Sequence, residues 1–144
     1  MTARAFFDTN ILVCFHDNRE PEKQRVAGQL LRTHMADRRL VLSTQVLQEF
    51  FVTVTQKLRA MPAAQAKALI GDYLQTHVVT VNPGHLLDAI DLHERYQLSF
   101  WDALILAAAK SAGVAVLFSE DFAHGQVYDG VRVENPFLAG TIAH

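Results

Sequence analysis

Short apolar runs alternate along this chain with longer segments whose apolar residues recur at helical spacing, and this alternation limits the fold more than any other feature. An apolar run of a few residues, without polar alternation, is typical of a strand buried on both faces of a sheet. Helices between such strands act as crossovers, which makes neighbouring strands parallel. We therefore predict the α/β class, with helices on both faces of a mostly parallel sheet of four to five strands.

The predicted elements follow from the same pattern. Strands are expected at residues 5–7, 40–42, 78–81 and 114–118, with 131–133 as the candidate fifth strand. Helices are expected at residues 9–15, 21–37, 46–58, 63–74, 86–96 and 103–109. The last of these segments is apolar on every side, so we expect that helix to be buried.

Length and composition narrow the class of protein. The chain has 144 residues, no visible repeat or linker and 50% hydrophobic residues, so we expect one domain over residues 1–144. The single cysteine, Cys14, has no internal disulfide partner, which favours a reducing, cytoplasmic location.

The longest apolar run, residues 103–109, is far shorter than the roughly 20 residues of a membrane span. A net charge of −2 gives no strong positive field for nucleic acid, although bound cations would change the local sign.

Three aspartates occupy positions that do not look like solvated surface. Asp8 and Asp121 follow predicted strands, and ligands of parallel sheets bind at the carboxyl ends of the strands. Asp102 lies in the first turn of the buried helix, between Trp101 and an apolar run. A lone buried carboxylate is costly, so each of these groups should have a cation or hydrogen-bond donors nearby.

Each aspartate also has a purely structural interpretation. Asp8 is suited to cap the helix that begins at Thr9, and Asp121 to turn the chain after its strand. Ser99 and Asp102 have the spacing of a capping box, in which the acid accepts from the backbone N–H of the cap residue. Several acids gathered at one edge of a sheet would repel one another unless a divalent metal neutralised them. A functional role is therefore favoured over a purely structural one if the fold brings these acids together.

Other site chemistries have little support in the sequence. The seven histidines show no zinc-ligand spacing, and Cys14 has no basic neighbour that would activate a thiolate. There is no phosphate-cradling glycine loop and no serine nucleophile elbow. The acids remain the best candidates.

Four segments of the chain resemble, in order, the acidic motifs of PIN-domain nucleases. These segments are residues 7–12 (FDTNIL), 45–50 (QVLQEF), 100–105 (FWDALI) and 117–122 (LFSEDF). The ending at residues 133–137 (VENPF) is also similar to theirs, so the likeness runs over nearly the whole chain. A PIN domain of this length most resembles the VapC toxins of type II toxin-antitoxin pairs, which implies a three-layer α/β/α fold.

The resemblance also implies roles for individual residues. It assigns the binding of Mg²⁺ or Mn²⁺ to a quartet of acids, namely Asp8, Glu49, Asp102 and Asp121. It assigns a supporting polar role to three neighbouring residues, namely Asn10, Ser119 and Glu120. Carboxylate oxygens are the ligands that such hard cations prefer. On a helical wheel Glu49 lies away from the apolar face and near Gln45 and Gln56, so its nomination rests on the family alone. Glu120 either assists its neighbour Asp121 or points away from it.

The implied activity is metal-assisted hydrolysis of RNA phosphodiester bonds, with 5′-phosphate and 3′-hydroxyl products. The implied partners are an RNA substrate, an antitoxin protein and a second copy of the chain. Trp101 and Tyr128 are aromatic candidates for stacking on bases, with a buried packing role favoured for Trp101.

Two alternatives remain open. The first is a PIN or receiver-like module that binds without cleaving. The second is a haloacid-dehalogenase-like phosphatase, which needs a second aspartate where this chain has Asn10.

Overall fold

The computed structural model describes residues 3–138 of the chain and contains a six-stranded sheet in the order β3-β2-β1-β4-β6-β5. The strands are β1 (Ala5–Phe7), β2 (Leu40–Ser43), β3 (His77–Val79), β4 (Val116–Phe118), β5 (Val127–Tyr128) and β6 (Val131–Glu134). All neighbours pair in parallel except β5 and β6, which are antiparallel. The prediction of a mostly parallel sheet is confirmed. The predicted number of four to five strands is too low because β5, with two residues, is too short for a periodic pattern.

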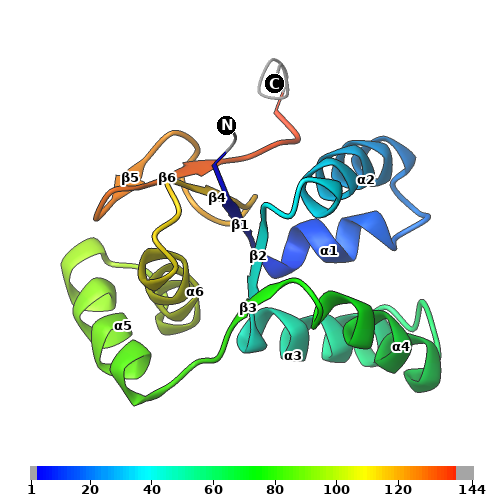
Figure 1. Ribbon diagram of the computed structural model, residues 1–144, viewed down its shortest axis with the longest axis horizontal. Helices are drawn as coiled ribbons and strands as arrows, with labels where there is room; N and C mark the ends of the chain where they lie inside the picture. Colours follow the sequence, from blue (N-terminus) through cyan, green and yellow to red (C-terminus); the bar gives the residue numbers. More distant parts are fainter. Residues whose placement is uncertain (1–2, 139–144) are drawn as a thin grey trace.

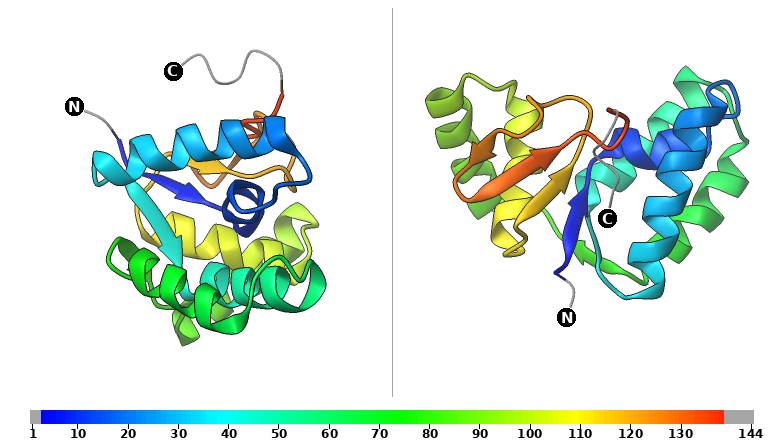
Figure 2. Two further views of the ribbon diagram at one scale, coloured as in Figure 1. Left: turned by 90° about the vertical axis from the view of Figure 1, so that its right-hand side faces the viewer. Right: turned by 90° about the horizontal axis from the view of Figure 1, so that it is seen from above.

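Helices connect β1 to β2, β2 to β3 and β3 to β4. They are α1 (Thr9–Phe15), α2 (Pro21–Ala36), α3 (Thr44–Val52), α4 (Ala63–Tyr73), α5 (Pro83–Tyr96) and α6 (Phe100–Ser111), with a π-helical turn η1 (Thr53–Lys57) after α3. Figures 1 and 2 show α1 to α4 on one side of the sheet and α5 with α6 on the other. The result is the expected α/β arrangement with helices on both faces.

The core lies where the strands and α6 meet. Phe6, Phe7 and Leu117 on adjacent strands are inaccessible to solvent. Each residue from Ala103 to Ala109 is buried, as the all-round apolar pattern of this segment predicts. A helix buried in this way fixes the position of its own first turn, where Asp102 lies. No helix in the described part of the chain has the length and apolar character needed to cross a membrane.

The predicted helix at residues 46–58 is only partly correct. It begins at Thr44, directly after β2, where the Ser43 hydroxyl accepts a hydrogen bond from the backbone N–H of Val46 at 3.3 Å. From Thr53 onward the backbone adopts π-helical hydrogen bonding instead of continuing as an α-helix. Apolar spacing does not distinguish the two, because a single inserted residue shifts only the part of the pattern that follows it.

Candidate active site

Asp8 lies at the carboxyl end of β1 and is buried. Its backbone N–H donates to the carbonyl of Phe118 at 3.0 Å, so β1 and β4 stay together up to the edge of the sheet. Its Oδ1 accepts from the N–H of Thr9 at 2.7 Å, and its Oδ2 accepts from the hydroxyl of Ser119 at 2.7 Å. The predicted capping role is confirmed, and it leaves the carboxylate at the centre of the site.

The environment of Asp8 disfavours its negative charge. Burial raises the pKa of Asp8 to about 7, opposed by the hydrogen bonds from Ser119 and Thr9. The negative charges of Asp121 and Glu49 raise the pKa further. A cation bound nearby would stabilise the ionised form of Asp8, because it would offset the repulsion from the neighbouring carboxylates.

Glu49 is half-buried on α3 and faces α1. The hydroxyl of Thr9 donates to its Oε1 at 2.6 Å, and Nε2 of Gln45 donates to its Oε2 at 3.2 Å. Gln45 also donates to the carbonyl of Trp101 at 3.1 Å, which ties α3 to the start of α6. The carboxylate that a helical wheel places away from the apolar face is therefore held in position from two sides.

Asp102 is half-buried in the first turn of α6. The Ser99 hydroxyl accepts from the backbone N–H of Asp102 at 3.1 Å, which confirms Ser99 as the cap. The reciprocal bond of a capping box, from the Ser99 N–H to the Asp102 carboxylate, is absent between these two described residues. Burial raises the pKa of Asp102, the Ser99 hydroxyl opposes the rise, and the charges of Asp121 and Glu49 add to it.

The end of β4 supplies the last acid and its supports. The hydroxyl of the buried Ser119 accepts from the N–H of Asp121 at 3.0 Å while it donates to Asp8, so it links the two acids. Nδ2 of Asn10 donates to Oδ2 of Asp121 at 3.0 Å. Glu120 forms an ion pair with Lys23 at 2.8 Å, so its carboxylate is engaged by α2.

The structure thus brings Asp8, Glu49, Asp102 and Asp121 from four separate segments to one edge of the sheet, where their charges interact. Within residues 3–138, no three Asp, Glu, His or Cys side chains converge closely enough to form a complete metal-binding set. The donor set is nevertheless all oxygen, and Mg²⁺ usually retains several waters and needs only one or two direct carboxylates. The site therefore fits a hydrated divalent cation.

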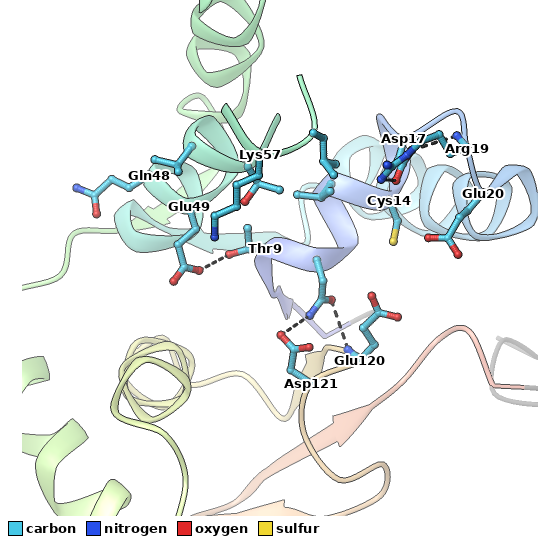
Figure 3. Close-up of a pocket in the computed structure, with 15 residues that line it drawn as sticks. Thr9, Cys14, Asp17, Arg19, Glu20, Gln48, Glu49, Lys57, Glu120 and Asp121 are labelled. Atoms are coloured by element: carbon cyan, nitrogen blue, oxygen red, sulfur yellow. Dashed lines mark hydrogen bonds and ion pairs between the residues drawn. The ribbon is translucent and has the colours of Figure 1, made fainter. Parts of the chain in front are cut away.

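A pocket of about 580 Å³ runs along α1 and α3, and Glu49 and Asp121, but not Asp8 and Asp102, belong to its lining (Figure 3). Glu49 and Asp121 line one part of it, and Arg19 and Lys57 also contribute to its wall. Figure 3 shows Thr9 and Glu49 on one side and Asp121 with Glu120 across from them.

Sequence reasoning assigned no role in the site to three residues that the structure places at or beside it. Thr9 and Gln45 hold Glu49, and Lys57 lines the opening. The spacing of four residues between Gln45 and Glu49 is a signal that could have identified the contact between these two side chains. The stacking candidates also need correction: Trp101 is 62% exposed rather than packed, whereas Tyr128 is buried.

Comparison with known proteins connects this geometry to a family. The PIN domain profile matches residues 5–129, most of the chain. A search of curated proteins found no match.

Solved structures with the same fold include three bacterial toxin-antitoxin proteins. VapC20 of Mycobacterium tuberculosis, described as a sarcin-ricin loop cleaving toxin, has 20% identity and a TM-score of 0.67, over 81% of this chain and 89% of that one. A toxin-antitoxin complex from Klebsiella pneumoniae has 21% identity and a TM-score of 0.68, over 92% and 98%. DNA-bound VapBC from Salmonella typhimurium has 14% identity and a TM-score of 0.67, over 94% and 99%. With its fold, its acidic edge and this profile match, the chain belongs to the PIN-domain family.

Proposed function

We propose that this protein is a metal-dependent endoribonuclease and the toxin of a type II toxin-antitoxin pair. The observation that carries the proposal is the gathering of four carboxylates at the carboxyl edge of the sheet, beside an open pocket. Membership of the PIN-domain family supports nuclease chemistry. The similarity to VapC20, described as a toxin that cleaves the sarcin-ricin loop, supports RNA as the substrate.

The proposed metal ligands are Asp8, Glu49, Asp102 and Asp121. When bound, Mg²⁺ or Mn²⁺ supplies positive charge that activates water and stabilises the leaving oxygen of a phosphodiester. The hydrogen bonds from Thr9 and Gln45 orient Glu49, and Ser119 orients Asp8. These donors fix the directions of the Glu49 and Asp8 carboxylates before the substrate arrives.

The remaining polar residues have supporting roles in this proposal. Asn10 holds Asp121 and also accepts from the N–H of Glu120 at 3.4 Å. The carboxylate of Glu120 is paired with Lys23, so we assign it to the pocket wall rather than to the ligands. No protein nucleophile is needed, because water is the attacking group.

We propose two protein partners, an antitoxin and a second copy of the chain. The antitoxin rests on the similarity to structures described as toxin-antitoxin complexes. The homodimer has support in large apolar side chains that are exposed on α5 and α6, Leu87 at 65% and Trp101 at 62%. Light scattering on the purified protein would give its mass in solution, and a monomer at all concentrations would contradict the homodimer.

Cleavage of single-stranded RNA by the purified protein tests the proposed activity. We expect cleavage with Mg²⁺ or Mn²⁺, none with EDTA, and none with Asp8→Asn in either metal. The matched control is Asp72→Asn, which removes an exposed carboxylate from α4 outside the pocket lining and should cleave like the wild type. A folded wild-type protein that binds RNA but leaves it intact would favour a non-catalytic module.

A further inference from the structure

The wall of the pocket beside the acids contains an irregular helical turn. In η1 the backbone N–H of Leu58 donates to the carbonyl of Thr53, five residues earlier, at 2.8 Å. The hydroxyl of Thr55 donates to the carbonyl of Phe51 at 2.6 Å, which gives that carbonyl a partner at the junction. Single π-helical turns inside α-helices occur frequently at functional sites.

The π-helical turn changes which side chain faces the pocket. In a continuous α-helix, eight residues separate Glu49 from Lys57, and at about 100° per residue the two would point about 80° apart. The π-helical turn contains one extra residue, so the Lys57 side chain is rotated by about 100° about the helix axis. It takes the direction that Gln56 would have in a continuous α-helix. Lys57 lines the pocket together with Glu49, and Gln56 does not. Figure 3 shows both side chains extending from this segment into the pocket.

Lys57 is also the pocket cation that is left available for a ligand. The other cation in the lining, Arg19, is held by Asp17, with Nε and Nη2 each 3.0 Å from a carboxylate oxygen. Lys57 is exposed and forms no ion pair with a carboxylate in the described part of the chain. An exposed ammonium beside an acidic cluster is suited to an anionic group that approaches those acids.

We propose that Lys57 binds a phosphate of the RNA substrate, next to the scissile phosphate on the same strand. The π-helical turn places the Lys57 side chain in position for this contact. This assignment rests on the proposed ribonuclease function. The carboxylates repel a polyanion, so a cation on the same side of the pocket as Glu49 offsets part of that repulsion along the strand. Phosphate contacts of this kind position a nucleic acid without reading its sequence.

The test is a kinetic comparison on a fluorescein-labelled, mixed-sequence single-stranded RNA with Mg²⁺ at several KCl concentrations. Lys57→Gln is expected to raise KM about tenfold and to change kcat less than about threefold, because the lost contact is made before and during the reaction. Since one phosphate contact disappears, the slope of log(kcat/KM) against log[KCl] should fall in magnitude by about 0.7. Lys57→Arg, which keeps the charge, should stay near the wild type.

Two controls separate position from net charge. Lys67→Gln removes an exposed lysine from α4 outside the pocket and should leave KM and the salt slope unchanged. The double variant Gln56→Lys, Lys57→Gln keeps the composition but moves the cation by one residue. We expect it to behave like Lys57→Gln, because the π-helical turn directs position 56 away from the pocket.

The outcomes distinguish this inference from the function on which it rests. If the wild type cleaves RNA and Lys57→Gln matches Lys67→Gln in KM and salt slope, the phosphate role of Lys57 is wrong while the ribonuclease stands. If the double variant matches the wild type, the placement by the π-helical turn is wrong. If the wild type neither binds nor cleaves RNA, both proposals fail.

Discussion

Replacing Asp8 by asparagine should change how the stability of the metal-free protein depends on pH. The pKa of Asp8 is raised from 3.8 to about 7, mainly by burial. Between these values the folded protein holds a proton that the unfolded chain has released, so the free energy of unfolding falls as pH rises. Above the pKa of the folded protein, Asp8 is ionised in both the folded and the unfolded state, and the free energy of unfolding falls no further. Asparagine does not titrate, so Asp8→Asn should lack this loss.

The size of the effect follows from the two pKa values. A difference of about 3 in pKa, at 1.36 kcal/mol for each, corresponds to at most about 4 kcal/mol between acidic and alkaline pH. The substitution also weakens the hydrogen bonds from Ser119 and Thr9, at a cost of about 1 kcal/mol or more. That cost applies at every pH. The variant should therefore be less stable than wild type near about pH 4 and more stable near about pH 8.

Thermal unfolding in EDTA, followed by circular dichroism from about pH 4 to about pH 8, measures this crossing. The difference in Tm between the two proteins should change by roughly 10 °C across the range. Asp72→Asn, which removes an exposed carboxylate, serves as the control. Two Tm profiles that stay parallel over the whole range would show that Asp8 has an ordinary pKa and would refute the reasoning.

Three further substitutions test the assignments of the other acids. Asp102→Asn should keep its stability within about 1 kcal/mol, because the Ser99 cap uses the backbone N–H, while RNA cleavage falls about a hundredfold or more; near-normal cleavage would remove Asp102 from the site. Asp121→Asn should melt no lower than wild type in EDTA but gain less Tm from added Mg²⁺; a lower Tm with an unchanged metal response would make Asp121 a structural cap. Glu120→Gln should cleave within a few-fold of wild type and lose at most about 1 kcal/mol, because it breaks only the partly exposed ion pair with Lys23; abolished cleavage would contradict that assignment.

Much of the fold is readable from the sequence because its elements are locally consistent. The unbroken apolar runs at residues 5–7 and 114–118 predict buried parallel strands, and the structure pairs β1 with β4, which covers the last three residues of the second run. The all-round apolar segment at 103–109 predicts the buried helix α6. The two-residue strand β5 is set by its pairing with β6, a contact that local periodicity does not encode.

The site was less accessible to sequence reasoning because its geometry depends on contacts between distant segments. Asp8 and Asp102 stand out from the apolar residues around them, but Glu49 looks solvated on a helical wheel, and its hydrogen bond from Thr9 comes from another helix. Lys57 carries no sequence signal, because the phase of its helix depends on a π-helical turn. Trp101 is exposed although it lies in the same helical turn as the half-buried Asp102, so the apolar character of Trp101 does not predict its burial.

The chemical identity of the cleaved RNA ends tests the central claim most directly. Hydrolysis by water at a metal held by the four acids predicts a 5′-phosphate and a 3′-hydroxyl, formed only with Mg²⁺ or Mn²⁺ and also at a 2′-deoxy-substituted cleavage position. Mass spectrometry of the products from wild type, with Asp8→Asn as the inactive control, distinguishes the possibilities. A 2′,3′-cyclic phosphate with a 5′-hydroxyl, formed equally well in EDTA, would contradict the account.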